Sequence, residues 1–336
     1  MRNAIIALRN QRASRGQHPG LLLQRYLCEN ATGDNGNPEE KRAILLAAIN
    51  AAHNAEVTQL YKDAFNRWRQ SLPELTAAKD LQTAGRLIVG LGSENVLETG
   101  ITLHHTYGLP WIPGSALKGL AAHYCAQVWG PTEPKFRKEA EYHRLLFGTT
   151  DESGCIIFHD GWFIPDSEKE PLKLDVMTPH HLNWLDGSVP PTDFDSPTPV
   201  PFLSVAGRFH IAVSWCGPAN DRSRNWTELT LSLLVDALHY WGIGGKTSSG
   251  YGRLVVPPPP PPPKKRNSGE SAQVTILAAR PNGGFDVQDI EPGRNPGTLT
   301  LGFPPPGTNT AIGAVVHVLV HNDDPQRPQY RWPPAN

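Results

Sequence analysis

The residues of this chain with the clearest chemical potential form one short segment, residues 242–252, with the sequence Gly-Ile-Gly-Gly-Lys-Thr-Ser-Ser-Gly-Tyr-Gly. This segment, called the glycine loop below, holds five glycines, one lysine and three aliphatic hydroxyl side chains. Because glycine lacks a Cβ, such a loop can adopt positive φ angles and bring its amides close to another molecule. A group of amides beside a lysine favours a phosphate as its ligand.

The centre of the glycine loop, Gly-Lys-Thr at 245–247, looks like the end of the phosphate-binding loop of nucleotide-hydrolysing proteins. That motif requires a glycine five positions before its last glycine, and this chain has Tyr240 there. It also requires a strand before the loop and a helix after it. Here residues 227–241 have the apolar spacing of an amphipathic helix and residues 252–256 read as a strand. Because the order of helix and strand is reversed, we expect the glycine loop to bind the phosphate of a molecule other than a nucleoside triphosphate.

Histidines offer a second kind of chemistry. The chain has 13 of them, including adjacent pairs at 104–105 and 180–181, and imidazoles serve as acid–base groups or zinc ligands. Adjacent residues of an extended strand face opposite ways, so a His-His pair seldom presents two ligands together. Neither pair has cysteine or carboxylate partners at ligand spacing. We therefore expect no metal and no cofactor.

The composition excludes several classes of protein. The chain has 336 residues, a formal net charge of −1 and a near-neutral isoelectric point, so any polyanion must bind through local basic patches. No apolar run has the length of a signal peptide or a membrane span. The cysteines lack C-x-x-C spacing, which is typical of reduced thiols; they are Cys28, Cys125, Cys155 and Cys216. We predict a cytoplasmic protein without membrane contact.

These candidate residues need a fold that positions them. The apolar spacing predicts helices over 38–68, 115–129 and 227–241, strands over 85–92, 201–205, 208–215 and 252–256, and a strand or hairpin over 154–164. In this order the core reads β–α–β–β–α–β with insertions, the arrangement of ferredoxin-like (RRM-like) domains. The expected fold class is α+β, with two helices over one face of an antiparallel sheet.

Proline marks a boundary in the chain. Seven consecutive prolines at 257–263 form a stiff polyproline II spacer, and Lys-Lys-Arg follows. We predict a helical extension packing on the core (1–80), a ferredoxin-like domain (81–256), a polyproline and basic linker (257–271), and a small β-rich module (272–336). Short strand signals in the last part suit a small all-β barrel of the OB or S1 type. An interaction module with no nucleic-acid function is the alternative.

Three ordered motifs resemble the RAMP superfamily of CRISPR proteins. Gly-x-Gly, five residues and a second Gly-x-Gly after an amphipathic helix looks like that family's C-terminal glycine-rich loop. Residues 98–119, from Glu-Thr-Gly to Leu-Lys-Gly, resemble the signature that precedes its first helix. Residues 175–181 (Asp-Val-Met-Thr-Pro-His-His) and 199–203 (Pro-Val-Pro-Phe-Leu) narrow the resemblance to the sixth Cmr subunits, terminal backbone proteins of type III-B effector complexes. The resemblance covers roughly residues 20–256.

The resemblance implies a non-enzymatic subunit that holds guide RNA towards its 3′ end, inside a ribonucleoprotein that destroys RNA matched by the guide. The implied partners are guide RNA (crRNA), target RNA and other Cmr subunits, namely a backbone RAMP neighbour, a small subunit and another RAMP subunit. Guide RNA offers phosphates and 2′-hydroxyls, which amides, lysines and hydroxyls bind without reading bases.

On this reading the glycine loop contains both RNA-binding and structural residues. The expected RNA-binding residues there are Gly244, Gly245, Lys246, Thr247, Ser248, Ser249 and Tyr251. Gly242, Gly250 and Gly252 are expected to be structural. Ser115, as N-cap, and Lys118 would add an anion site at the start of the helix over 115–129. His104 and His105 would stack on RNA or form hydrogen bonds within the fold.

The alternative function is a RAMP endoribonuclease that acts on guide precursor or target RNA through acid–base chemistry of His104, His105 or His180. Neighbouring type III backbone subunits cleave target RNA with an aspartate in a loop after the first strand. The matching residues 93–107 contain Glu94 and Glu98 but no aspartate, which favours a non-catalytic role. Asp151 and Asp175 stay open as catalytic candidates.

Overall fold

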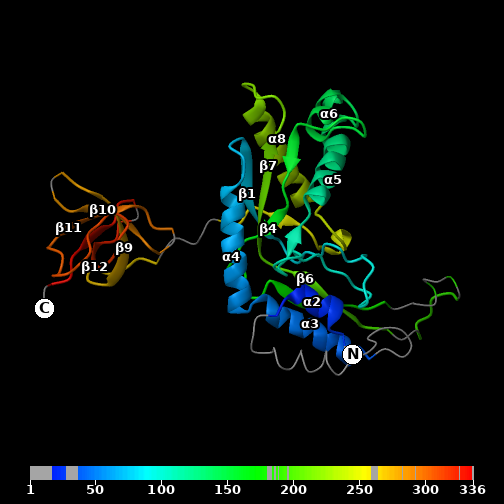
Figure 1. Ribbon diagram of the computed structural model, residues 1–336, viewed down its shortest axis with the longest axis horizontal. Helices are drawn as coiled ribbons and strands as arrows, with labels where there is room; N and C mark the ends of the chain where they lie inside the picture. Colours follow the sequence, from blue (N-terminus) through cyan, green and yellow to red (C-terminus); the bar gives the residue numbers. More distant parts are fainter. Residues whose placement is uncertain are drawn as a thin grey trace. The chain divides into compact units, whose positions relative to one another are not determined.

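The structure is a computed structural model (Figure 1) that describes residues 17–27, 37–179, 184, 187, 189–194, 197–258, 264–281, 283–291, 293–324 and 326–334. The chain divides into two compact units, Met1–Pro257 and Pro258–Asn336, and each has its own hydrophobic core. Among the described helices, none is both long and apolar enough to cross a membrane. Cys28, His180 and His181, together with most of the proline run, lie outside the described residues.

A six-stranded antiparallel sheet forms the centre of the first unit, in the order β2-β4-β7-β1-β8, with β3 also paired to β7. Its two long strands, β1 (Thr76–Thr83) and β7 (Arg208–Trp215), pair from Thr76↔Ser214 to Gln82↔Arg208. The shorter strands are β2 (Trp111–Ile112), β3 (Ile156–Phe158), β4 (Gly161–Phe163) and β8 (Leu254–Val255). Every residue of β7 after Arg208 is buried, so this strand lies at the centre of the core.

The strand predicted over 85–92 is wrong. The strand in that part of the chain is β1, which begins at Thr76, while Leu87 forms only an isolated bridge to Val205. The apolar run Leu-Ile-Val at 87–89 is cut off by Gly90, whose φ is +85°. The carbonyl of Ile88 accepts a hydrogen bond from the glycine loop instead of from a neighbouring strand, so the segment is extended but irregular.

The N-terminal part of the first unit is helical. The helix predicted over 38–68 is two helices, α3 (Pro38–Ala52) and α4 (Ala55–Gln70), because Asn54 leaves the helical conformation and accepts a hydrogen bond from the Glu56 amide as an N-cap. The short helix α2 (Pro19–Arg25) packs against α3. A two-stranded sheet of β5 (Leu172–Met177) and β6 (Val200–Val205) also contacts α3.

Two helices pack against each other and against the central sheet. These are α5 (Gly114–Tyr124), which continues as a π-helical turn (Cys125–Trp129), and α8 (Ser223–Tyr240). Helix α8 contacts β1, β7 and β8, and α5 contacts β3. The short helix α6 (Glu141–Phe147) packs against α5. Helix α8 ends at the glycine loop, and β8 starts directly after it, so the helix-before, strand-after order read from the sequence is correct.

The second unit is a closed barrel of five strands, which confirms the predicted all-β module. The strands follow one another around the barrel as β10-β11-β13-β12-β9, and the ring closes between β9 and β10. Their bounds are β9 (Ser271–Ala279), β10 (Phe285–Asp289), β11 (Gly297–Leu301), β12 (Val315–Asn322) and β13 (Gln329–Arg331). Alternating Ala272, Val274 and Ile276 on β9 face the barrel core, the period of a strand with one buried face.

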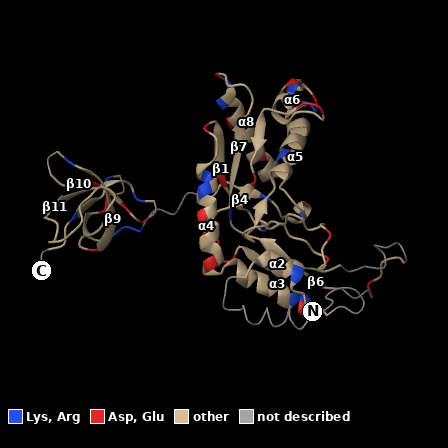
Figure 2. Ribbon diagram, in the orientation of Figure 1, with Lys and Arg blue, Asp and Glu red and all other residues tan. Residues whose placement is uncertain are grey.

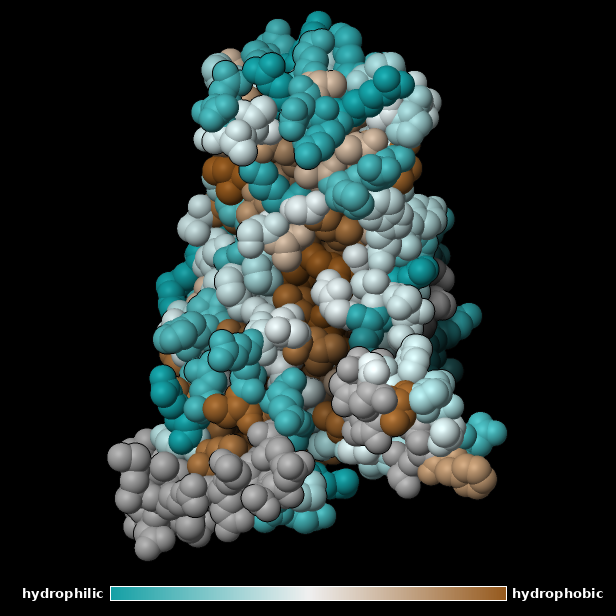
Figure 3. Space-filling view, turned by 90° about the vertical axis from the view of Figure 1, so that its right-hand side faces the viewer, coloured by the Kyte–Doolittle hydropathy of each residue, from teal (hydrophilic) through white to brown (hydrophobic). Residues whose placement is uncertain are grey.

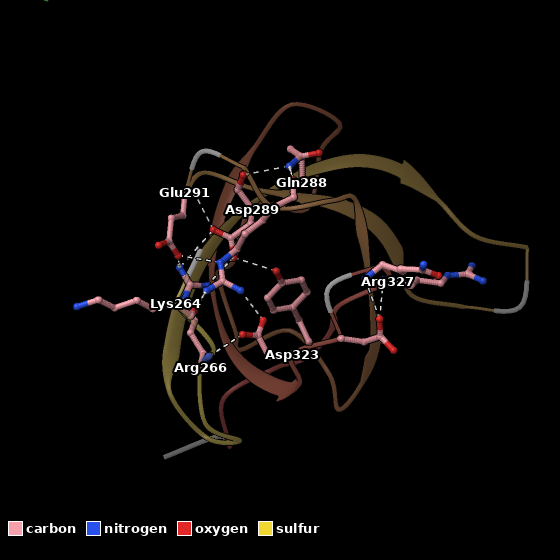
Figure 4. Close-up of polar contacts among 11 residues, drawn as sticks. Lys264, Arg266, Gln288, Asp289, Glu291, Asp323 and Arg327 are labelled. Atoms are coloured by element: carbon pink, nitrogen blue, oxygen red, sulfur yellow. Dashed lines mark hydrogen bonds and ion pairs between the residues drawn. The ribbon is translucent and has the colours of Figure 1, made fainter. Parts of the chain in front are cut away.

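A network of ion pairs joins the start of the second unit to its barrel (Figure 4). The guanidinium of Arg266 binds Asp289, which is fully buried and also accepts a hydrogen bond from the Tyr330 hydroxyl. Arg294 binds Asp323 at 2.5 Å, and the same carboxylate accepts a hydrogen bond from the Arg266 amide at 2.6 Å. Each buried charge has an opposite partner, so the network ties the basic residues after the prolines to the barrel.

Candidate RNA interface

Two glycines close the base of the glycine loop. Gly242 and Gly252 have φ angles of +76° and +80°. A Cβ on Gly252 would lie 2.1 Å from the Ile243 carbonyl oxygen, and one on Gly242 would lie 3.0 Å from the Gly252 carbonyl carbon. The Ile243 amide donates to the Gly252 carbonyl at 2.9 Å across this base. No other residue type fits this close backbone contact with positive φ, so both glycines have a structural role.

The loop rests on the irregular segment that follows β1. The amide of Gly245 donates to the carbonyl of Ile88 at 2.8 Å, and the amide of Gly252 donates to the carbonyl of Arg86 at 2.7 Å. A Cβ on Gly244 would lie 2.0 Å from the Ile88 oxygen, so this position also needs glycine for packing. These contacts correct the expectation for Gly245, whose amide is already used within the fold.

The tip of the loop keeps unused donors. The amides of Gly244, Lys246, Thr247 and Ser248 form no hydrogen bond to any described residue. Lys246 has a φ of +58°, in the left-handed region that few residues other than glycine occupy, and a short 3₁₀ turn (Thr247–Ser249) follows it. Successive amides around such a left-handed residue form a concave anion site. The Lys246 side chain is half-buried and makes no ion pair with a described residue, while Ser248 and Ser249 are exposed.

Tyr251 is held by the fold. Its hydroxyl donates to Asp175 at 3.2 Å, and its ring lies 6.2 Å from that of Phe202. The Asp175 carboxylate also accepts a hydrogen bond from the Ser204 hydroxyl at 2.5 Å. Burial and the nearby Asp175 charge both raise the pKa of Tyr251. Asp175 therefore anchors the glycine loop to the β5–β6 sheet, a role that the sequence did not indicate.

Two arginines missed by the sequence reasoning lie at the base of the loop. Arg253 directly follows Gly252 and is exposed, and its carbonyl accepts a hydrogen bond from Ala84. Arg86 is half-buried and donates to the Ser204 hydroxyl at 3.4 Å. The sequence did contain a signal for both residues, because each arginine directly follows a glycine, Gly85 or Gly252. Figure 2 shows basic and acidic residues interspersed over the ribbon, so these local cations matter more than the net charge.

The N-terminus of α5 does not offer the anion site that was expected. Its N-cap is Pro113, not Ser115, and the Gly114 amide donates to the Asp160 carboxylate at 2.7 Å. A protein carboxylate thus already occupies the positive end of this helix. Ser115 and Lys118 are both exposed, and within the described part of the chain no hydrogen bond links them to the glycine loop.

His104 is built into a turn, whereas His105 is exposed. The Nδ1 atom of His104 accepts a hydrogen bond from the Thr106 amide at 3.2 Å, and its ring lies 4.7 Å from Tyr107 and 5.0 Å from Trp162. Burial lowers the pKa of His104, although the nearby Asp160 charge opposes that shift. Of the other candidates, Glu94, Glu98 and Asp151 are exposed. The described residues contain no group of three side chains able to hold a metal ion.

Comparison with known proteins places these features in a family. Residues 80–255 match the family model described as RAMP superfamily. The chain is 31% identical over 252 residues to the CRISPR system Cmr subunit Cmr6 of Pyrococcus furiosus, which covers 59% of this chain and 73% of that protein.

Two solved structures are also similar. A chain in the cryo-EM structure of the type III-B Cmr-beta bound to cognate target RNA matches 68% of this chain and 77% of its own length, with a TM-score of 0.49 and 19% identity. The crystal structure of Cmr6 from Pyrococcus furiosus matches 54% of this chain and 98% of its own length, with a TM-score of 0.35 and 31% identity. The chain therefore belongs to the RAMP superfamily and, within it, is a homologue of Cmr6 of the CRISPR Cmr system.

Proposed function

We propose that this chain is a non-catalytic backbone subunit of a cytoplasmic type III-B CRISPR effector complex, and that it binds guide RNA near its 3′ end. The observation that carries the proposal is the tip of the glycine loop, where the amides of Lys246 and of three nearby residues have no hydrogen-bond partner among the described residues. Arg86 and Arg253 add positive charge at its base. Such a site binds phosphates and 2′-hydroxyls irrespective of base sequence, which a subunit must do if its guide sequences vary.

We further propose that the core is ferredoxin-like. Strands β8, β1, β7 and β4 are neighbours in this order and every pair is antiparallel. Numbered along the chain, they lie in the order 4-1-3-2, with α5 and α8 as the two connecting helices. This connectivity explains why the glycine loop, which follows α8, contacts the segment that follows β1. Strands β8 and β1 pair antiparallel, so the loop before β8 lies beside the segment after β1.

The proposed partners are guide RNA, target RNA and other Cmr subunits, namely a backbone RAMP neighbour, a small subunit and another RAMP subunit. The relative in Pyrococcus furiosus is named as a Cmr subunit, which supports assembly with other Cmr proteins. Figure 3 shows a strip of hydrophobic residues between hydrophilic ones on one face of the molecule. Exposed apolar surface of this kind commonly marks a protein interface.

A structural role for the candidate acid–base groups supports the absence of catalysis. His104 is packed between aromatic rings and bonded to the next turn, and Asp175 holds Tyr251 and Ser204. His105 is exposed and has no carboxylate partner among the described residues. A general acid or base needs a partner that sets its protonation and a pocket that holds substrate.

The proposal is tested by Lys246→Ala in the assembled complex. We expect weaker guide binding for guides of different sequence, and a salt dependence reduced by about 0.7 in slope for one lost contact to single-stranded RNA. Lys138→Ala is the matched control, because that side chain is 79% exposed and, within the described part of the chain, its one ion pair is a weak contact with Glu139 at 4.0 Å. Equal binding by both variants would show that the loop is only structural.

The catalytic alternative is separated by a cleavage assay. The purified chain, alone and assembled, is incubated with repeat RNA and with guide-matched target RNA. We expect no cleavage that depends on this subunit. Cleavage that is lost on His104→Ala, His105→Ala or His180→Ala would refute the non-catalytic role.

A further inference from the structure

The barrel of the second unit has a hollow beside its second and third strands. The hollow encloses about 520 Å³ and is formed by the turn between β9 and β10, the end of β11 and the residue that follows β13. The residues that shape it are Arg280, Gly284, Phe285, Phe303 and Trp332. Three of these five are aromatic, and none of the described lining residues carries a carboxylate.

Glycines and close ring packing give the hollow its shape. Gly284 has a φ of +84°, and a Cβ there would lie 2.5 Å from the Leu299 carbonyl oxygen. The rings of Phe285 and Trp332 meet edge to face, with centroids 6.3 Å apart and an interplanar angle of 88°. The backbone amide of Trp332 donates to the Leu301 carbonyl at 2.9 Å, which holds the backbone at Trp332 beside β11. Trp332 and Leu299 are buried and supply apolar atoms to the lining.

Among the described lining residues, Phe303 offers an exposed ring to a ligand and Arg280 offers a positive charge. Phe303 is 89% exposed and makes no ring contact with another described aromatic residue. A single exposed aromatic ring is normal on a protein surface, but both faces of this ring are open to stack on a base. Arg280 is the one charged side chain among the described lining residues, and only its Nε is near a carboxylate, 3.4 Å from Asp286. An open ring beside a guanidinium suits a planar base attached to a phosphate.

The strand connectivity agrees with such a ligand. In chain order the strands lie as 1-2-3-5-4 around the closed barrel, and the third and fifth, β11 and β13, are parallel. This is the connectivity of OB folds, which bind oligonucleotides on the face of strands two and three and at the loop between strands one and two. The hollow lies at these same places.

We propose that this hollow binds an unpaired nucleotide of a single-stranded RNA, with its base stacked on Phe303 and its phosphate near Arg280. Residues of the second unit alone line this site, whereas the glycine loop belongs to the first unit. The site thus gives the chain a second RNA contact beyond the proposed guide-binding role.

The test uses the full-length protein and a fluorescein-labelled oligouridine of about 12 nucleotides, within the usual range for one such barrel. Fluorescence anisotropy should show that Phe303→Ala raises the Kd about tenfold, the expected loss of one stacked base, whereas Phe303→Trp binds normally. Arg280→Gln should reduce the slope of log Kd against log salt by about 0.7. Ile312→Ala is the control, because this apolar side chain is 72% exposed on the same unit and does not line the hollow.

Three results would overturn the proposal: no binding of oligouridine by the unmodified chain, equal binding by Phe303→Ala, or equal affinity for duplex RNA. Binding of a proline-rich peptide that needs Phe303, without binding of RNA, would identify a peptide site and also overturn it. Lys246→Ala separates this site from the glycine loop. If Lys246→Ala changes nothing in the assembled complex while Phe303→Ala still weakens oligouridine binding, the proposed guide-binding role fails and the barrel site stands.

Discussion

Gly244→Ala tests whether the glycine loop is held in place by its contact with the segment after β1. Gly244 has a φ of +86°, and an added Cβ would lie 2.0 Å from the Ile88 carbonyl oxygen. Gly250, at the other side of the loop, has a φ of +87° but no atom within 4 Å of an added Cβ. Gly250→Ala is therefore a matched control that introduces the same backbone conformation without the clash.

The expected difference follows from these two environments. Alanine in the left-handed conformation costs about 1–2 kcal/mol at either site. Only alanine at 244 must also move the loop away from Ile88. That movement disrupts the hydrogen bonds from Gly245 to Ile88 and from Gly252 to Arg86, at 2.8 and 2.7 Å. With a net value of about 0.5–1.5 kcal/mol for each bond, Gly244→Ala should cost about 1–3 kcal/mol more than Gly250→Ala.

Urea unfolding followed by tryptophan fluorescence measures this difference. Every tryptophan except Trp332 belongs to the first unit, so the signal reports mainly on that unit. The difference in the free energy of unfolding between the two variants is the quantity of interest, and their m-values should agree. Equal destabilisation by Gly244→Ala and Gly250→Ala would refute the reasoning. Guide binding by the assembled complex should also weaken more for Gly244→Ala, because Lys246 moves with the loop.

The ion-pair network of the barrel supplies two more predictions. Asp289→Asn removes the fully buried carboxylate that binds Arg266 and Tyr330, while Arg266 keeps its ion pair with Glu291, so the barrel should be destabilised by about 1–3 kcal/mol. Hydrogen exchange should then speed up throughout the barrel strands, whereas Asp286→Asn, at a 47% exposed side chain, should change little. Burial acts to raise the pKa of Asp323, but hydrogen bonds from Arg266 and Arg294 outweigh it and hold that pKa below its usual range. This carboxylate therefore adds stability above its unfolded pKa of about 3.9, and the stability is lost as the pH falls through the lower folded value. The unfolding temperature of the barrel should therefore fall in this acidic range. If an Asp323→Asn variant shows the same pH dependence as the unmodified chain, Asp323 is not the group responsible.

Local patterns were enough to predict many elements of the fold. The amphipathic spacing over 227–241 predicted α8, and the strand signals over 208–215 predicted β7 at its observed bounds. The glycine pattern and the two upstream motifs predicted the RAMP superfamily and the sixth Cmr subunits, which the family model and the Cmr6 relative confirm. These signals lie within short stretches of chain, where side-chain period and backbone freedom depend on neighbouring residues.

The errors occurred where a partner from a distant part of the chain decided the outcome. The polar sequence of β1 forms a strand because β7 pairs with it along seven residues, while the more apolar residues 85–92 do not. Asn54 divided a helix that the apolar period alone had continued. β-structure depends on cross-strand packing more than on intrinsic preference, so the sequence pattern ranked the two candidate strands wrongly.

By itself, the sequence determined that residues 242–252 form a glycine-rich turn between a helix and a strand, and that a lysine lies within it. Only the tertiary structure decided which of its groups remain for a ligand. Ile88 takes the amide of Gly245, Asp175 takes the hydroxyl of Tyr251, and the amides around Lys246 stay unpaired among the described residues. The physical reason is that a polar group is satisfied by whichever partner the fold brings within about 3 Å, and here those partners come from remote parts of the chain.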